Sequence, residues 1–185
     1  MIELELLDAA QTRPLFSELI DIYQAAFSQP PYYETLPDFL NFAGRLSYHA
    51  NQPGFRCVIA RRAPGWPVAG FAYGYAGTTT SWFYQLATGR LAPEQIADFL
   101  SDFFEFAELA VQPDLQDQGL GGELHDALLA GLKNRTALLA TPEVETRALY
   151  LYRKRGWQHL AGGIALPGTA MRYQIMAKWL AIESD

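Results

Sequence analysis

The feature that most constrains this chain is the run Phe103–Val111, which is followed within a few residues by glycines. The run is almost entirely apolar and typical of a buried strand. An amphipathic pattern then predicts a helix over about 119–134, opened by Gly119, Gly121 and Gly122. Glycines permit close approach to the backbone, and a helix start offers unpaired N–H groups at the positive end of its dipole. The segment therefore predicts a cradle for an anion such as a pyrophosphate.

Two common anion-binding motifs do not fit this segment. A P-loop requires a Lys directly after its last glycine, and no Lys follows here. The dinucleotide fingerprint requires a third glycine, but Leu124 occupies that position. Its strand should also come early in a βαβ unit, whereas Phe103–Val111 lies past the middle of the chain.

The segment resembles the GNAT N-acetyltransferase superfamily. Gln116–Gly121 reads Gln-Asp-Gln-Gly-Leu-Gly and matches the family signature Gln/Arg-x-x-Gly-x-Gly/Ala at every fixed position. Leu-Ala-Val-x-Pro precedes it at residues 109–113. An Ala…Tyr…Gly-aromatic block follows it, in which Tyr152 stands between Ala148 and Gly156. The resemblance covers about residues 55–160 in order.

The resemblance implies a mixed α/β fold: one domain over residues 1–185, with a twisted mixed sheet of six or seven strands flanked by helices. The strand Phe103–Val111 and a short strand over 136–140 would be parallel and would splay apart at the cofactor site. The implied cofactor is acetyl-CoA, without a metal; its pantetheine would pair with the first strand's end and its pyrophosphate with the amides that follow. The implied cofactor-binding residues are Leu109, Ala110, Val111, Gln116, Asp117, Gln118, Gly119, Leu120, Gly121 and Gly122.

Two residues depart from the family pattern. Asp117 stands where a small or basic residue is more common, near the expected pyrophosphate. Glu145 stands where the family often has an Asn that contacts the pantetheine arm. Neither change affects the backbone donors.

Tyr152 is the candidate general acid. In the family this phenol protonates the departing thiolate, and a group with a pKa of about 10 suits that role. The alternative is that Tyr152 only packs on the core, since its helical spacing also predicts burial.

Glu105 and Glu108 are the candidate general bases, because charged residues are rarely buried in an apolar strand without purpose. In a regular strand they face opposite sides, and a bulge would change that parity. A salt bridge or a substrate contact is the alternative role for either carboxylate.

Other residues allow two interpretations each. An aromatic group could line the acceptor site or form a satellite core. His125 lies beside the helix's apolar stripe and is expected on a solvated face. Residues 153–155 are expected on a solvated helix end, with a contact to the cofactor's 3′-phosphate as the alternative. The aromatic group comprises Tyr32, Tyr33, Trp82, Phe83 and Tyr84.

The remaining patterns predict alternating helices and strands. The segment 76–92 is expected to be a loop with a short helical piece. Gly156 is expected to end the helix predicted over 146–155. Predicted strands cover 2–7, 55–61, 68–75, 103–111, 136–140, 157–164 and 170–178; predicted helices cover 14–27, 35–50, 93–100, 119–134 and 146–155.

Composition narrows the class of function. Half of the residues are hydrophobic and 18% are charged, which predicts a folded chain. A net charge of -6 argues against nucleic acid and suits a cationic substrate. Neither a signal sequence nor an apolar run of about 18 residues is present, so a cytoplasmic location without membrane contact is expected. The single Cys57 excludes an intrachain disulfide.

The resemblance to the GNAT superfamily implies transfer of an acetyl group from acetyl-CoA to an amine, and the acidic composition favours a small cationic acceptor, such as a polyamine or an aminoglycoside-like compound. Two alternatives stay open: a module that binds or senses CoA without turnover, and an acyltransferase that uses a longer chain. The sequence also leaves the oligomeric state open, with a homodimer as one option.

Overall fold

The computed structural model describes residues 2–180, which form a seven-stranded mixed sheet with helices on its faces. The strand order is β1-β2-β3-β4-β5-β7-β6. β4 and β5 are parallel, whereas β1–β2, β2–β3, β5–β7 and β6–β7 are antiparallel. The expected mixed α/β sheet of six or seven strands is confirmed. The strands are β1 (Glu3–Leu7), β2 (Arg56–Arg61), β3 (Val68–Ala76), β4 (Phe103–Val111), β5 (Thr136–Pro142), β6 (Gln158–Ala165) and β7 (Arg172–Trp179).

The chain divides into two compact units. Unit 1 comprises residues 2–75 together with Ala107–Ala130, and unit 2 comprises Ala76–Phe106 together with residues 131–180. The boundary falls within β4, which gives its first half to unit 2 and its second half to unit 1.

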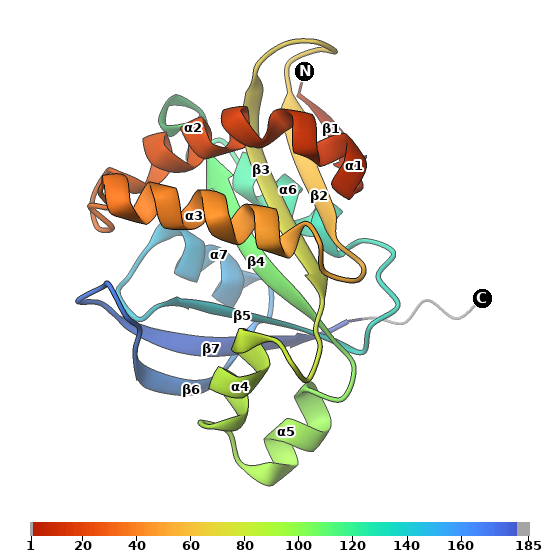
Figure 1. The fold of residues 1–185 in the computed structure, drawn as a ribbon, viewed down its shortest axis with the longest axis vertical. Coiled ribbons are helices and arrows are strands. Elements are labelled where there is room, and N and C mark those ends of the chain that lie inside the picture. Colours follow the sequence, from red (N-terminus) through yellow and green to blue (C-terminus); the bar gives the residue numbers. More distant parts are fainter. Residues whose placement is uncertain (1, 181–185) are drawn as a thin grey trace. The chain divides into compact units, whose positions relative to one another are not determined.

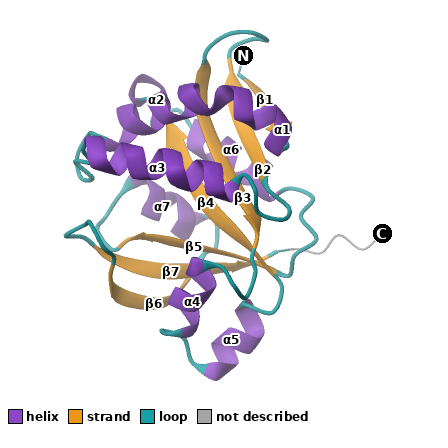
Figure 2. Ribbon diagram, in the orientation of Figure 1, coloured by secondary structure: helices purple, strands orange, loops and turns teal. Residues whose placement is uncertain are grey.

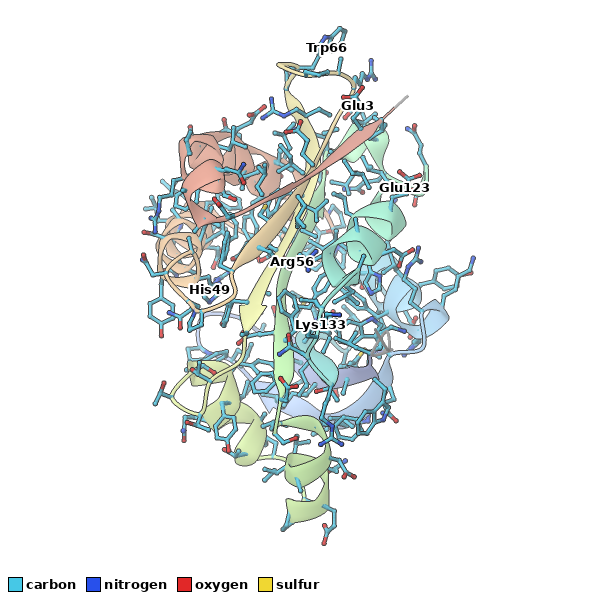
Figure 3. The ribbon with its side chains drawn as sticks, turned by 90° about the vertical axis from the view of Figure 1, so that its right-hand side faces the viewer. Glu3, His49, Arg56, Trp66, Glu123 and Lys133 are labelled. Carbon is cyan, nitrogen blue, oxygen red and sulfur yellow. The ribbon has the colours of Figure 1, made fainter. Side chains whose placement is uncertain are left out.

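Unit 1 is built on the β1–β3 meander. α2 (Phe16–Phe27) and α3 (Leu36–His49) lie side by side over one face of β2 and β3, and α6 (Leu120–Leu129) lies behind these strands (Figure 1). Arg56 of β2, labelled in Figure 3, donates from Nη2 to the Ala127 carbonyl at 3.4 Å. This bond serves a carbonyl in the last turn of α6, where no intrahelical donor is available.

Local capping explains where two helices of unit 1 begin. The expected start of α3 at Thr35 is observed, and the amide of Thr35 donates to Asp38 Oδ2 at 2.8 Å. A second capping box between Asp8 and Gln11 opens a short helix, α1 (Ala9–Thr12), that sequence reasoning missed. A 3-10 turn, η1 (Arg13–Leu15), joins α1 to α2, so helical structure begins five residues before the predicted position 14.

The core of unit 1 is aromatic. Tyr23 of α2 stacks on Phe42 of α3 with ring centroids 3.8 Å apart, and Phe42 lies 6.3 Å from Phe71 of β3. Leu19 and Leu46 complete this layer without exposure to solvent.

Unit 2 contains the other half of the sheet. β5 pairs with β7 along its whole length, from Thr136 with Trp179 to Pro142 with Tyr173 (Figure 2). The parallel pairing of β4 with β5 covers Phe103–Glu105 and Thr136–Leu138. The further expectation that these strands splay apart at a cofactor site stays a prediction.

Up to residue 180, unit 2 contains three helices: α4 (Trp82–Thr88), α5 (Pro93–Phe99) and α7 (Arg147–Lys154). α4 is the short helical piece expected within 76–92, and its N-cap Ser81 Oγ accepts from the amide of Tyr84 at 3.1 Å. A cluster that includes Phe83, Phe103 and Leu138 forms the core beneath α4 and α5.

Some element boundaries differ from the predicted ones. α6 ends at Leu129 rather than near residue 134, because Ala130 leaves the helix and Gly131 adopts φ +69°. β5 continues to Pro142 rather than ending at residue 140. Gly156 has φ +77° and ends α7, as predicted. Over residues 2–180, none of the helices combines the length and the apolarity needed to cross a membrane.

Candidate active site

The loop between β4 and α6 has an unusual backbone. After a 3-10 turn, η2 (Pro113–Leu115), two residues adopt left-handed conformations: Asp117 with φ +60° and Gly119 with φ +89°. Asp tolerates this region better than most residues, whereas the wider angle at Gly119 favours glycine. Backbone turns of this kind direct successive N–H groups toward a common point and make concavities that bind anions.

The first turn of α6 leaves its leading amides without helical acceptors. The amides of Gly122 and Glu123 both donate to the Gly119 carbonyl, at 2.9 and 3.2 Å. The N–H groups just before them lie at the positive end of the helix dipole. A Cβ placed on Gly119 would meet nothing within 4 Å, so the space beside this backbone is open. This geometry is what an anion cradle requires.

Two glutamines fix the loop. Gln116 Nε2 donates to the Val111 carbonyl at 3.0 Å, which ties the loop to the end of β4. Gln118 Nε2 donates to the Asp114 carbonyl, also at 3.0 Å. The side chains of both predicted cofactor-binding glutamines thus hold the loop.

Glu108 lies among charged and aromatic side chains of α2 and α3. Its Oε2 is 3.8 Å from Arg45 Nη2, and its Oε1 accepts from the Leu109 amide at 3.3 Å. The Glu108 side chain is 15% exposed, whereas that of Arg45 is 49% exposed. Arg45 Nη2 also donates to Tyr23 Oη at 3.4 Å, at the edge of hydrogen-bond range.

The surroundings of Glu108 alter its acidity. Burial raises the pKa of Glu108 to about 8, although Arg45 lowers it in part and Glu34 raises it further. A carboxylate with a pKa close to the working pH can both accept and release a proton, as a general base must.

Glu34 and Tyr23 extend this cluster. Glu34 lies in the loop between α2 and α3, and it accepts a hydrogen bond from Tyr23. Burial raises the pKa of Glu34, and it raises that of Tyr23 as well, with the charge of Glu108 adding to the second effect. Glu34, Tyr23, Arg45 and Glu108 are called the Glu108 cluster below.

Glu105 occupies a different position on β4. It belongs to unit 2, is 6% exposed, and pairs across the parallel ladder with Leu138. The structure therefore assigns the two predicted carboxylates to separate units and places Glu108 in the charged cluster of unit 1.

Tyr152 lies in the aromatic core of unit 2. It is 6% exposed; its ring is perpendicular to that of Phe106 at 6.0 Å and lies 5.7 Å from that of Trp157. α7 is fixed at its start by Thr146, whose Oγ1 accepts from the Leu149 amide at 3.0 Å. Both interpretations of Tyr152, as a packed ring and as an acid, are compatible with this position.

Comparison with known proteins places the chain in a family. A model of the acetyltransferase (GNAT) family matches residues 13–157. The chain belongs to this family. A GCN5-like protein acetyltransferase of Mycobacterium tuberculosis is 33% identical over 124 residues, which cover 63% of this chain and 60% of the relative.

Solved structures support the fold of this GNAT protein. The ribosomal-protein-S18-alanine N-acetyltransferase of Escherichia coli superposes with a TM-score of 0.64 at 18% identity, over 100% of this chain and 97% of that one. NAA60 of Arabidopsis thaliana in complex with acetyl-CoA superposes with a TM-score of 0.62 at 15% identity, over 97% and 99%. At these identities the likeness concerns the fold alone.

Glu145, one of the two departures from the GNAT pattern, has a partner on the next helix. Arg153 Nη1 lies 2.8 and 2.9 Å from the two carboxylate oxygens of Glu145, and both side chains are more than half exposed. The exposure agrees with the solvated helix end predicted for Arg153.

The remaining candidate residues differ in whether the structure buries or exposes them. Phe83 is buried in the core of unit 2, as the satellite-core alternative predicted, whereas Trp82 and Tyr33 are exposed. The expectation that His125 is solvated is wrong: it is 1% exposed, and its Nδ1 lies 2.7 Å from Asp126 Oδ1. α6 buries a wider face than its apolar stripe indicates, and His125 falls within it.

Sequence reasoning overlooked Arg45 and Tyr23. A signal was present, because Arg45 directly precedes Leu46 and follows Phe42 by three positions, at the edge of an apolar stripe. Tyr23 follows Leu19 by four positions and shares its buried face. An Arg at the edge of a buried stripe can pack its apolar stem on the core and place its head group beside a carboxylate of the fold.

Proposed function

We propose that this protein transfers an acetyl group from acetyl-CoA to an amine of a small-molecule acceptor. The observation that carries the proposal is the left-handed loop Asp117–Gly119, which leads into the start of α6 in a chain of the GNAT family. Acetyl-CoA supplies an activated thioester and a pyrophosphate, and the start of this helix suits the pyrophosphate.

Glu108 is the proposed general base. An amine is mostly protonated near pH 7, since its ordinary pKa is about 10.4, and it must lose a proton before attack. Glu108 takes this proton, directly or through water, and the amine nitrogen then bonds to the thioester carbonyl carbon while the carbon–sulfur bond breaks. Tyr152 is the proposed acid that protonates the departing thiolate. The nitrogen loses its second proton as it becomes an amide, which restores the proton of Tyr152 through solvent, and Glu108 then releases its own proton to solvent. Glu105 is the second candidate for the base.

The acceptor is proposed to be cationic, such as a polyamine or an aminoglycoside-like amine. The chain has a net charge of -6, and the Glu108 cluster becomes net negative whenever Glu108 is ionised, because it then holds two carboxylates and one guanidinium. Negative surroundings concentrate cationic ligands. The Mycobacterium relative, which is named a protein acetyltransferase, makes a protein amine the second candidate.

An acceptor panel tests this proposal. The protein is incubated with acetyl-CoA and polyamines, aminoglycosides, amino acids or peptides, and the products are identified by mass spectrometry between pH 6 and 10. Acetylated cationic amines are expected, at rates that rise with pH. Preferential acetylation of peptides would support the second candidate, while CoA binding without any product would indicate a sensing module. Faster transfer from longer acyl-CoA thioesters would indicate a different acyl donor.

The CoA site is tested separately by calorimetry with Gly119→Val. A β-branched residue is strained at φ +89° and fills the open space beside the amides, so CoA affinity should fall at least tenfold. Gly65→Val is the matched control, because Gly65 also has positive φ and open surroundings but lies in the β2–β3 turn. Unchanged CoA affinity in Gly119→Val would place the pyrophosphate elsewhere.

A further inference from the structure

We propose that Arg45 and Glu34 are an opposed pair of positioning residues that together set the charge and orientation of the Glu108 carboxylate. This inference rests on the proposed function, in which Glu108 is the base. Neither residue belongs to the motif that identifies the family, and both come from the α2–α3 region of unit 1.

Arg45 stabilises the ionised form of Glu108. Its Nη2 lies 3.8 Å from Oε2, within the distance at which an opposite charge lowers a carboxyl pKa. Arg45 is half exposed, so it retains hydration while its head group reaches the less exposed Glu108. The guanidinium also donates to Tyr23 Oη, which fixes its direction.

Glu34 opposes that effect. Its carboxylate places a second negative charge in the cluster, which raises the pKa of Glu108. The Glu34 amide donates to the Phe27 carbonyl at 2.9 Å and holds the loop against the end of α2. Tyr23 bonds one side of this carboxylate, while Oε2 is buried without a hydrogen-bond partner among residues 2–180. Glu34 is therefore held by its backbone and is linked through the Tyr23 hydroxyl to the Arg45 guanidinium.

The neighbouring titratable groups contribute less charge. His49 of α3 also interacts electrostatically with Arg45, but burial lowers its pKa to about 4, so it is neutral near pH 7. Tyr23 of α2 is neutral as well, because burial raises its pKa. Tyr73 of β3 interacts with Arg45, and Asp38 of α3 acts on Glu34. The charges that bear on Glu108 from unit 1 near pH 7 are thus chiefly those of Arg45 and Glu34.

This arrangement suits a proton acceptor. When Glu108 is ionised, two carboxylates and one guanidinium carry a net negative charge. When Glu108 takes a proton from an acceptor ammonium, the net charge of the three side chains becomes zero. Burial is the main reason why both forms of Glu108 are accessible near neutral pH, and the opposed charges of Arg45 and Glu34 adjust the balance between them.

The test measures Glu108 itself. With ¹³C-labelled glutamate, the carboxyl resonance of Glu108, assigned by its absence in Glu108→Gln, is titrated in the protein without substrates. Arg45→Gln should raise the titration midpoint by on the order of one pH unit, and Glu34→Gln should lower it by a smaller amount. Arg45→Lys should restore most of the wild-type midpoint. The controls Arg90→Gln and Glu94→Gln remove exposed charges in unit 2 and should leave it unchanged.

Opposite shifts are the signature of the pair, because a merely structural role would disturb Glu108 in the same way in both variants. Shifts in one direction, or none, would overturn the inference. The pH profile of kcat/KM should move with the resonance in each variant. Opposite shifts of the resonance without acetylation of any amine would refute the proposed function and support the roles of Arg45 and Glu34. Acetylation of an amine with unmoved resonances would support the proposed function and refute those roles.

Discussion

The two units differ in what their cores contain. The core cluster of unit 1 surrounds Tyr23 and packs next to Arg45 and Glu108, so charge lies directly against its aromatic rings. The core cluster beneath α4 and α5 in unit 2 consists of side chains such as Phe83, Leu138 and Ile175, which carry no charge. Buried charge costs free energy and is kept where it has a use, whereas an apolar core contributes stability alone.

Unit 2 also buries one carboxylate, that of Glu105, which pairs across the ladder with Leu138. The contact of Glu108 with its charged partner Arg45 is the reason for proposing Glu108 rather than Glu105 as the base.

The largest effect is expected for Glu108→Gln, which keeps the shape of the side chain and removes its charge. If Glu108 is the base, kcat should fall about 10²–10⁴-fold. The rate of the wild type should rise with pH as Glu108 loses its proton near its pKa of about 8. This rise should be absent from Glu108→Gln. Steady-state kinetics over pH 6 to 10 measure both changes.

Glu105→Gln is the matched comparison, since it makes the same change three residues away on β4. We expect a smaller loss of kcat and an unchanged pH profile. A larger loss for Glu105→Gln than for Glu108→Gln would reverse the assignment of the two carboxylates and break the contrast between the units.

Tyr152→Phe tests whether unit 2 contributes to the chemistry. The ring and its packing on Phe106 and Trp157 are kept, and the phenolic proton is lost. We expect kcat to fall about 10²-fold, at the lower end of the effect of a general acid, with CoA affinity preserved. Full activity of this variant, measured beside its melting temperature, would leave Tyr152 as a packing residue.

Two core substitutions test whether the units unfold as one domain. Leu19→Ala in unit 1 and Leu138→Ala in unit 2 both truncate side chains that are 0% exposed. Each should lower the free energy of unfolding by about 2–5 kcal/mol. Because β4 belongs to both units, we expect a single transition in calorimetry that moves to lower temperature in either variant. Two separate transitions, each moved by one variant, would contradict the predicted single domain.

Much of the fold was predictable because its signals are local. The apolar run of β4, the Thr35–Asp38 cap and Gly156 each report a conformation that nearby residues decide. The missed helix α1 also had a local signal, the Asp8–Gln11 capping box, but it is too short for periodicity to show. The buried face of α6 was not predictable, because His125 lies in a layer that forms only when distant segments pack.

The candidate site was predictable in part. The glycines after β4 and the carboxylates on it stand out in one stretch of sequence, and the left-handed angle at Gly119 follows from its residue type. The Glu108 cluster joins residues from α2, the following loop, α3 and β4, which only the tertiary fold brings together. No spacing along the chain indicates that Arg45 lies beside Glu108.

The smallest expected effect concerns His49, which lies at the end of α3 (Figure 3). Its Nδ1 is 3.1 Å from Tyr73 Oη, and burial, with the charge of Arg45, lowers its pKa to about 4. The ordinary histidine pKa is about 6.5, so below that pH the unfolded chain binds a proton that the folded chain refuses. The stability that neutral His49 contributes is complete above about pH 6.5 and is lost as the pH falls toward 4.

His49→Gln isolates this contribution from the opposite trend of Glu108, whose raised pKa lowers stability as the pH rises toward 8. Because both proteins share Glu108, the difference between their unfolding free energies contains only the His49 part. We expect the unfolding free energy of the wild type, relative to that of His49→Gln, to fall by on the order of 1 kcal/mol between pH 7 and pH 4.5 in urea denaturation. His159→Gln, which removes an exposed imidazole from unit 2, should leave the curve nearly unchanged. A difference that is constant across this range would mean that His49 takes up its proton in the folded chain. Water would then reach the side chains around His49 and Arg45 more than their contacts indicate. The contrast with the apolar cluster beneath α4 and α5 would be weaker.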